Sequence, residues 1–206
     1  MKILVLGANG RVGSKVVASL LGRGHSVVAA VHKSHANVPE AAEVFQINLE
    51  DRESIEKAII GCDAVVCALS SWNAPKHDVL ATAMKIIIPI MEASGVKRIV
   101  SISGDVARVE GENISLPIRL FHIFAFGPIR QVITDSEEHI SLLGKSKLDW
   151  TVLRPGIMTS AEHGNYTLRS SHPFSITIPR AAVVESIVDL VESDSYVRAA
   201  PFIARS

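Results

Sequence analysis

Residues 1–24 read MKILVLGANGRVGSKVVASLLGRG, and this stretch decides the fold. An apolar run, Ile3–Leu6, has the composition of a buried strand, and Val12–Arg23 has the apolar spacing of a helix. Between them lie glycines at positions 7, 10 and 13. A strand that passes through a glycine-rich turn directly into a helix is the context in which such glycines bind a dinucleotide.

Each glycine in this turn has a separate physical task. The first lets the chain turn sharply, the second lets a pyrophosphate approach the backbone, and the third lets the helix pack on the strand. The start of the helix adds N–H groups and the positive end of its dipole. We therefore predict that this turn holds the pyrophosphate of a nicotinamide dinucleotide. The predicted contacts are Gly7, Asn9, Gly10, Arg11, Val12 and Gly13.

The rest of the chain alternates strand-like and helix-like segments. The predicted strands are rich in Val, Ile, Leu and Ala: Ile3–Leu6, Ser26–Val31, Glu43–Ile47, Ala64–Ala68, Arg98–Ile102 and Trp150–Leu153. The predicted helices lie between them: Val12–Arg23, Arg52–Ile60, Val79–Ser94 and Ile129–Leu143. Such alternation predicts a doubly wound parallel sheet, and continuously apolar strands indicate helices on both faces. We therefore predict one three-layer α/β/α domain over residues 1–206.

Beyond Pro155 the pattern is weaker. It predicts a polar stretch over Thr159–Ser171, a short strand near Phe174–Ile178, a helix near Arg180–Glu192 and a final apolar segment near Tyr196–Ile203. We interpret this tail as a small cap on the substrate side of the same domain.

Composition excludes several classes of function. Hydrophobic residues make up 48% of the chain, and 21 basic side chains balance 21 acidic ones, so nothing favours a nucleic-acid partner. The apolar start runs directly into glycines and is too short for a signal peptide or a membrane span, so we expect a cytoplasmic protein with no membrane partner. Cys62 and Cys67 lack the spacing of a zinc site and are predicted to be reduced core thiols; no metal is predicted.

The spacing of the glycines, Gly-x-x-Gly-x-x-Gly, resembles that of the short-chain dehydrogenase/reductase superfamily. More narrowly, the chain resembles the small atypical NAD(P)H-binding proteins that include NmrA-like and biliverdin-IXβ or flavin-reductase-like members. The segments GCDAVV (61–66), SGVKRIV (94–100) and LDWTVLRPG (148–156) carry the likeness along most of the chain. The resemblance implies a Rossmann fold with a bound nicotinamide cofactor.

The end of the second predicted strand bears on which cofactor binds. An acidic residue there would bind the ribose 2′-hydroxyl and repel a 2′-phosphate, but this chain has His32 and Lys33. Together with Arg11 in the glycine turn, these residues could surround a 2′-phosphate with charge-assisted donors. We therefore predict NADP(H) in preference to NAD(H).

The resemblance implies further cofactor contacts at the ends of later strands. A polar residue after the third strand lies near the adenine in this superfamily, and Asn48 stands there, followed by Leu49. The carboxyl ends of parallel strands form the cofactor crevice, so residues after the fourth strand are expected to line the nicotinamide ribose, and those after the sixth the nicotinamide. These residues are Ala68, Leu69 and Ser70, with Ser71 and Trp72 beside them, and then Pro155, Gly156 and Ile157.

The catalytic pattern of the superfamily is incomplete. Ser103, after the fifth predicted strand, matches the serine that holds a carbonyl oxygen, but no Tyr-x-x-x-Lys occurs, since the only tyrosines are Tyr166 and Tyr196. A flavin or another conjugated acceptor can take its proton from solvent, so the missing tyrosine fits a reductase of that type. Other possible proton donors are His122, His139 and His163.

Three functions therefore stay open. The first is an NAD(P)H-dependent reductase that acts on a small conjugated acceptor such as a flavin or quinone, with Ser103 polarising it. The second is a redox sensor that binds NADP(H) without chemistry. The third is a nucleotide-sugar epimerase, which the missing tyrosine and the short tail disfavour. The chain is expected to be a monomer or a homodimer.

Overall fold

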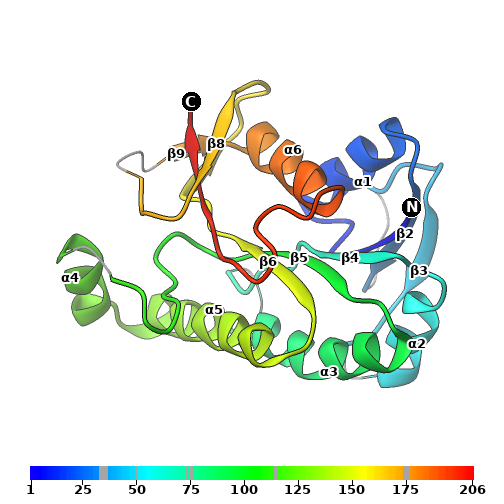
Figure 1. The fold of residues 1–206 in the computed structure, drawn as a ribbon, viewed down its shortest axis with the longest axis horizontal. Helices are drawn as coiled ribbons and strands as arrows, with labels where there is room; N and C mark the ends of the chain where they lie inside the picture. The colour runs from blue at the N-terminus through cyan, green and yellow to red at the C-terminus, as the bar shows by residue number, and fades with distance from the viewer. Residues whose placement is uncertain (33–36, 50, 73, 75–76, 114–115, 174–176) are drawn as a thin grey trace.

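A parallel sheet of six strands forms the centre of the computed structural model, which describes all residues except 33–36, 50, 73, 75–76, 114–115 and 174–176. The strand order is β3-β2-β1-β4-β5-β6, as expected for a doubly wound sheet (Figure 1). The strands are β1 (Lys2–Leu6), β2 (Ser26–Val31), β3 (Glu43–Gln46), β4 (Ala64–Cys67), β5 (Arg98–Ile102) and β6 (Asp149–Leu153). All six match predicted strands to within one residue at each end.

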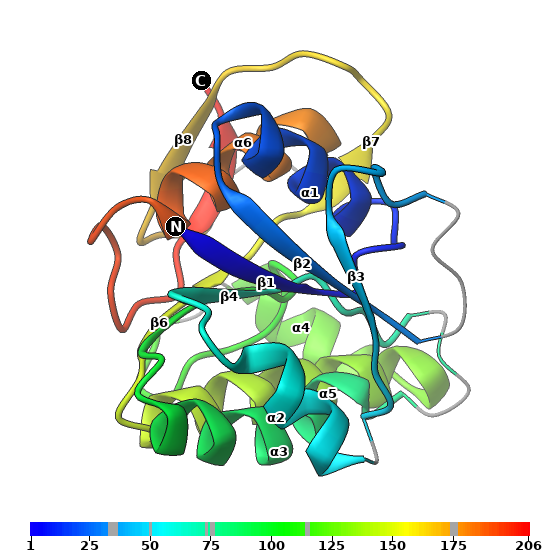
Figure 2. The same ribbon diagram turned by 90° about the vertical axis from the view of Figure 1, so that its right-hand side faces the viewer.

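Helices cover both faces of this sheet, which confirms the three-layer prediction. The helices α1 (Gly13–Gly22) and α6 (Arg180–Val191) pack on one face, and α2 (Arg52–Ile59), α3 (Val79–Ser94) and α5 (Gly127–Lys145) lie on the other (Figure 2). Alternate residues of each strand belong to two separate cores. In β1, Leu4 and Leu6 pack toward α3, whereas Ile3 and Val5 pack toward α1. The continuous apolar strands follow from burial on both sides.

The ends of the helices show how local sequence sets the crossovers. Asp51 caps α2, because its side chain accepts a hydrogen bond of 3.1 Å from the amide of Glu53. Gly95 ends α3 with a φ of 74°, a left-handed conformation that glycine adopts without steric cost. Because β4, β5 and β6 pair in parallel, their carboxyl ends lie along one edge of the sheet.

The C-terminal tail contains more strands than the sequence predicts. It forms β7 (Ile157–Thr159), β8 (Tyr166–Arg169), β9 (Thr177–Pro179) and β10 (Phe202–Arg205), and of the strand predicted at 174–178 only the end is described, within β9. Here β7 pairs with β9 and β8 with β10 in two small sheets. The polar stretch is a poor strand signal because these two-stranded sheets leave many side chains partly in water. The tail runs beside β6, where Arg154 bridges to Phe202.

A further helix, α4 (Leu116–Phe124), was not predicted at all. Most of its apolar residues lie on the exposed side, so they do not form the core-facing stripe by which a surface helix is recognised. Figure 1 shows α4 at one end of the long axis of the molecule, beyond the start of α5. In the described part of the chain, no helix combines the length and apolar character that spanning a bilayer requires.

Candidate functional site

The glycine turn packs tightly against the end of β4 and the start of α1. A Cβ atom on Gly7 would lie 2.9 Å from the carbonyl oxygen of Ala68, and one on Gly13 would lie 2.2 Å from the carbonyl oxygen of Gly7. Gly7 also has a φ of 76°, which disfavours other residues. The amide of Gly10 donates to the Gly7 carbonyl at 2.9 Å and closes the turn. Two of the three glycines are thus required by the local packing.

The remaining glycine and the start of α1 fit an anionic group. Gly10 is exposed, and a Cβ there would meet only the Gly7 carbonyl oxygen, at 3.1 Å, so its outer side is open. No side chain caps α1 at Val12, and no acidic residue lies in its first turn, unlike α2. The first amides of a helix lack partners within the helix, so this end can bind a pyrophosphate. The residues present therefore fit the predicted cofactor.

The predicted adenosine-side residues follow β1, β2 and β3, at the same edge of the parallel sheet as the glycine turn. Arg11, His32 and Asn48 are exposed, whereas Lys33 lies outside the described residues. Asn9 has a structural role that the sequence did not indicate, because its Oδ1 accepts from the Asn37 amide at 3.0 Å. This bond ties the segment after β2 to the glycine turn. Leu49 packs against the core between the sheet and the helices α2, α3 and α5.

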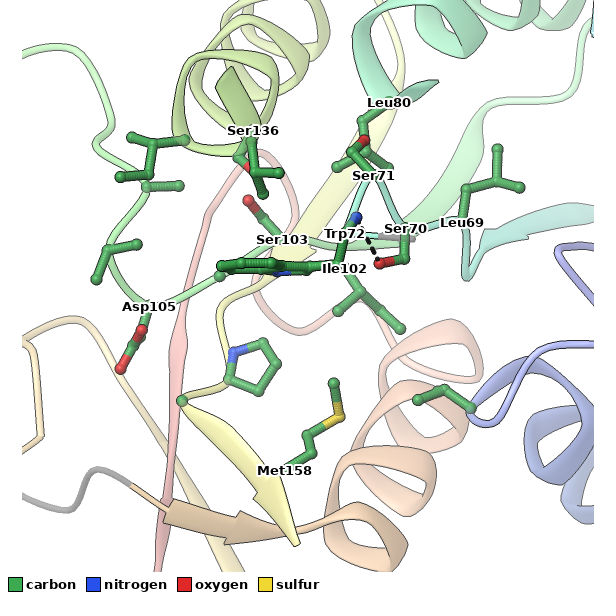
Figure 3. Close-up of a pocket in the computed structure, with 18 of the residues that line it drawn as sticks. Leu69, Ser70, Ser71, Trp72, Leu80, Ile102, Ser103, Asp105, Ser136 and Met158 are labelled. Carbon is green, nitrogen blue, oxygen red and sulfur yellow. Dashed lines mark hydrogen bonds between the residues drawn. The ribbon is translucent and has the colours of Figure 1, made fainter. Parts of the chain in front are cut away.

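A cavity of about 340 Å³ opens at the carboxyl ends of β4, β5 and β6 (Figure 3). Most of its lining is apolar. The residues predicted from sequence that line it are Val12, Ala68, Leu69, Ser70, Pro155, Gly156, Ile157 and the candidate catalytic Ser103. The structure thus brings together three strand ends that are distant in the chain. The other predicted residues that the structure describes lie in the glycine turn and after β2 and β3.

Hydroxyl groups lie on one side of this cavity. Ser103 Oγ is buried and has no hydrogen-bond partner among the described residues. Its backbone amide donates to the Leu153 carbonyl at 2.9 Å, which fixes the residue at the junction of β5 and β6. Figure 3 shows Ser136 from α5 near Ser103, and the Trp72 ring lies across the cavity. A polar atom without a partner beside an apolar cavity is suited to hold a ligand oxygen.

A buried carboxylate, which the sequence analysis missed, organises one wall of the cavity. Asp135 of α5 is 3% exposed and accepts hydrogen bonds from the amides of Leu80 (3.1 Å) and Ala81 (2.8 Å) at the start of α3. The Ser71 hydroxyl also donates to it. Asp135 therefore caps α3 from a neighbouring helix and holds the segment that carries Trp72.

One turn further along α5, His139 is fully buried. Its Nε2 lies 2.8 Å from the Ser101 hydroxyl, and burial lowers the pKa of His139 to about 4. His122 is also buried, with its Nε2 2.8 Å from the Val106 carbonyl oxygen. Neither these histidines nor His163 belongs to the cavity lining. The structure therefore gives no support to a histidine as proton donor.

Replacing His139 by glutamine is expected to remove a pH-dependent part of the stability. Folded His139 stays neutral down to about pH 4, whereas the unfolded side chain takes up a proton near pH 6.5. Because the unfolded state binds more protons between these values, the free energy of unfolding falls by about 3 kcal/mol as the pH falls through this range. Urea unfolding at about pH 7.5 and about pH 4.5 measures it. Equal losses in the wild type and the variant would contradict this origin.

Asp105 is the one ionisable residue of the lining in the part of the chain that the structure describes. Burial raises the pKa of Asp105, and the nearby His172 ring, whose Nε2 is 3.6 Å away, opposes that shift. Figure 3 shows its carboxylate directed away from Ser103, at the edge of the cavity. No sequence signal distinguishes this aspartate, because it follows Gly104 in a loop without periodicity.

Arg154, next to the predicted Pro155, has a structural role. It is 2% exposed, forms two hydrogen bonds of 2.7 Å to the Glu112 carboxylate and stacks on the Phe202 ring at 3.7 Å.

Both cysteines are buried and free, in agreement with the prediction of core thiols, and burial raises the pKa of each.

Comparison with protein families and curated proteins agrees with this geometry. A family model described as NAD(P)H-binding matches residues 7–194. An uncharacterized protein of Mycobacterium tuberculosis is 24% identical over 94% of this chain, and the chain spans 19% of the length of that relative. YhfK of Bacillus subtilis, an uncharacterized sugar epimerase, is 28% identical over 76% of this chain and 72% of its own length.

Solved structures share the whole fold. A Streptococcus pneumoniae protein proposed to be an NADH-flavin reductase aligns over 100% of both chains with a TM-score of 0.82 and 19% identity. A short-chain dehydrogenase/reductase of Veillonella parvula, solved in complex with NADP, aligns over 98% of this chain and 94% of its own with a TM-score of 0.80 and 16% identity. At such identities the likeness is one of fold.

Proposed function

Because the chain belongs to the NAD(P)H-binding family, we propose that it is an NADPH-dependent reductase of a small, planar conjugated acceptor such as a flavin or a quinone. The observation that carries this proposal is the cavity at the ends of β4, β5 and β6, next to a glycine turn that fits a pyrophosphate. An apolar cavity with a few hydroxyl groups suits a planar, weakly polar ring.

The glycine turn and the uncapped start of α1 would hold the pyrophosphate, and Pro155–Ile157 would lie beside the nicotinamide. When bound, NADPH supplies a hydride to the acceptor. The apolar lining excludes water, and Trp72 packs against the flat face of the acceptor. Ser103 donates its hydroxyl proton in a hydrogen bond to the acceptor atom that gains charge. A proton completes the reduction. The acceptor takes it from solvent, because the Asp105 carboxylate at the edge of the cavity points away from Ser103.

A preference for NADPH over NADH is part of the proposal. The end of β2 carries no acidic residue, and exposed Arg11 is a cation in the glycine turn that could meet a 2′-phosphate. The solved Veillonella parvula protein, which has the same fold, contains NADP, and this supports the proposed preference. Calorimetric titration of the purified protein is expected to give a Kd for NADPH about tenfold or more below that for NADH.

The Ser103→Ala variant tests the chemistry. It is expected to lower kcat for NADPH oxidation with flavin or quinone acceptors about 100-fold, because one hydrogen bond to the developing charge is lost. The Kd for NADPH should not change, since the cofactor is held elsewhere. Ser160→Ala, at an exposed position after β7, serves as a control with unchanged rates. Background rates with every acceptor in the wild type would overturn the reductase proposal.

A second candidate function is an NADP(H)-binding redox sensor. It is favoured by what α5 carries. In the superfamily that the chain resembles, this helix would carry a tyrosine and a lysine four residues apart. Here Asp135 and His139 have that spacing, but both are buried in internal hydrogen bonds. Tight NADPH binding without turnover on any acceptor would support the sensor.

A further inference from the structure

Helix α4 and the turn that follows it present a large apolar surface. The described residues include twelve exposed large apolar side chains, and seven of them lie between Leu116 and Ile129. The most exposed are Phe126 (82%), Phe124 (71%) and Ile123 (69%). We call these seven side chains the α4 face: Leu116, Leu120, Phe121, Ile123, Phe124, Phe126 and Ile129. Contiguous exposed apolar surface of this kind marks an interaction site.

The α4 face is held in a defined position on the body of the protein. Ile118 and His122 are the buried residues of α4, and the His122 ring is hydrogen-bonded to the Val106 carbonyl oxygen. Arg130, at the start of α5, donates to the His122 carbonyl oxygen at 3.0 Å. The outer side of the helix points away from the sheet, at the end of the molecule (Figure 1). The inner side of α4 is therefore fixed to the rest of the protein, and its outer side is exposed.

The charged side chains within this part of the sequence are basic. No acidic residue occurs from Asn113 to Thr134, whereas Arg119 and Arg130 lie in this segment and are exposed. Three acids flank the segment. Asp135 is buried, whereas Glu112 pairs with Arg154 at 2.7 Å and Glu137 pairs with Arg108 at 2.5 Å. An apolar helix face with net positive charge complements an anionic surface that has an apolar interior.

We propose that the α4 face binds the surface of an anionic phospholipid bilayer, with α4 lying in the plane of the interface. Phe, Ile and Leu side chains would enter the boundary between headgroups and acyl chains, while Arg119 and Arg130 contact lipid phosphates. Pairing with a second copy is less favourable, because symmetric contact would bring the arginines of two copies together with no acid in the segment to neutralise them. The proposal departs from the sequence-based expectation of no membrane partner, and it does not depend on reductase activity.

Flotation of the full-length protein with lipid vesicles tests this proposal. We expect binding to vesicles that contain phosphatidylglycerol and much weaker binding to vesicles of phosphatidylcholine alone. Ile123→Ser should reduce partitioning about tenfold through lost apolar burial, and Arg119→Gln about fivefold through a lost phosphate contact. Ile60→Ser is the matched control, because Ile60 is 67% exposed at the end of α2, away from the face.

The outcomes separate the alternatives. Selective binding to anionic vesicles that is lost in Ile123→Ser and kept in Ile60→Ser supports the proposal. Equal binding of Ile123→Ser and wild type overturns it. A dimer in light scattering that Ile123→Ser dissociates, with no vesicle binding by the wild type, overturns it in favour of self-association. Thermal unfolding of each variant, expected to match the wild type, shows that the changes act at the surface.

Discussion

Replacement of Gly13 by alanine is expected to abolish measurable NADPH binding and to lower the free energy of unfolding by about 2 to 3 kcal/mol. The added Cβ would lie 2.2 Å from the carbonyl oxygen of Gly7 and 2.8 Å from its carbonyl carbon. Both are backbone atoms, so no side-chain rotation relieves the clash, and the turn must move away from α1. That movement displaces the amides that would face the pyrophosphate. Calorimetric titration and urea unfolding measure the two effects.

Gly22, at the other end of α1, provides the matched control. A Cβ there meets nothing within 4 Å, so Gly22→Ala is expected to stabilise the protein by up to about 1 kcal/mol, since alanine is the better helix former. Its NADPH affinity should equal that of the wild type. Wild-type affinity in Gly13→Ala would mean that the glycine turn is not the cofactor site.

The sequence predicted the central sheet well because its signal is local and redundant. Residues Ile3 to Leu6 of β1 are fully buried from both sides, so every position in the strand must be apolar. Helices between such strands leave few alternatives to a parallel sheet. The short tail strands β7 and β8 lack this signal, because pairing in a two-stranded sheet leaves their side chains only partly buried.

Helix α4 illustrates the opposite difficulty. Sequence reasoning expects a surface helix to alternate apolar and polar faces, with its apolar stripe toward the core. In α4 most apolar side chains are on the exposed side, so the sequence shows no apolar stripe toward the core. If the exposed apolar side of α4 binds lipid, one cause explains why the sequence predicted neither the helix nor a membrane partner.

The site was predictable where it is built from strand ends. Carboxyl ends of parallel strands meet at one edge, so Ser70, Ser103 and Pro155 were expected to converge, and all three line the cavity. Contributions from α5 were not predictable, because they depend on how that helix is rotated against the sheet. Asp135 in particular stands near Glu137 and Glu138, in a run that reads as an ordinary solvated helix face.

Asp135→Asn is expected to lower the free energy of unfolding by about 3 kcal/mol. The carboxylate accepts from the amides of Leu80 and Ala81 with different oxygens, and the amide group keeps only one of those acceptors. The other is replaced by an NH2 group that faces an N–H donor in a buried site. The charge that complements the start of α3 is lost as well. Urea unfolding at neutral pH measures this loss.

Glu138→Gln makes the matched comparison, because it is the same chemical change on the same helix and also removes a link to α3. Glu138 contacts Lys85 at 2.7 Å, but both side chains are exposed. Water replaces such a contact at little cost, so the expected loss is below about 1 kcal/mol. If Asp135→Asn cost no more than Glu138→Gln, the cap on α3 would not require a charge. In that case packing, and not the hydrogen bond from Ser71 to Asp135, would hold Trp72 in position.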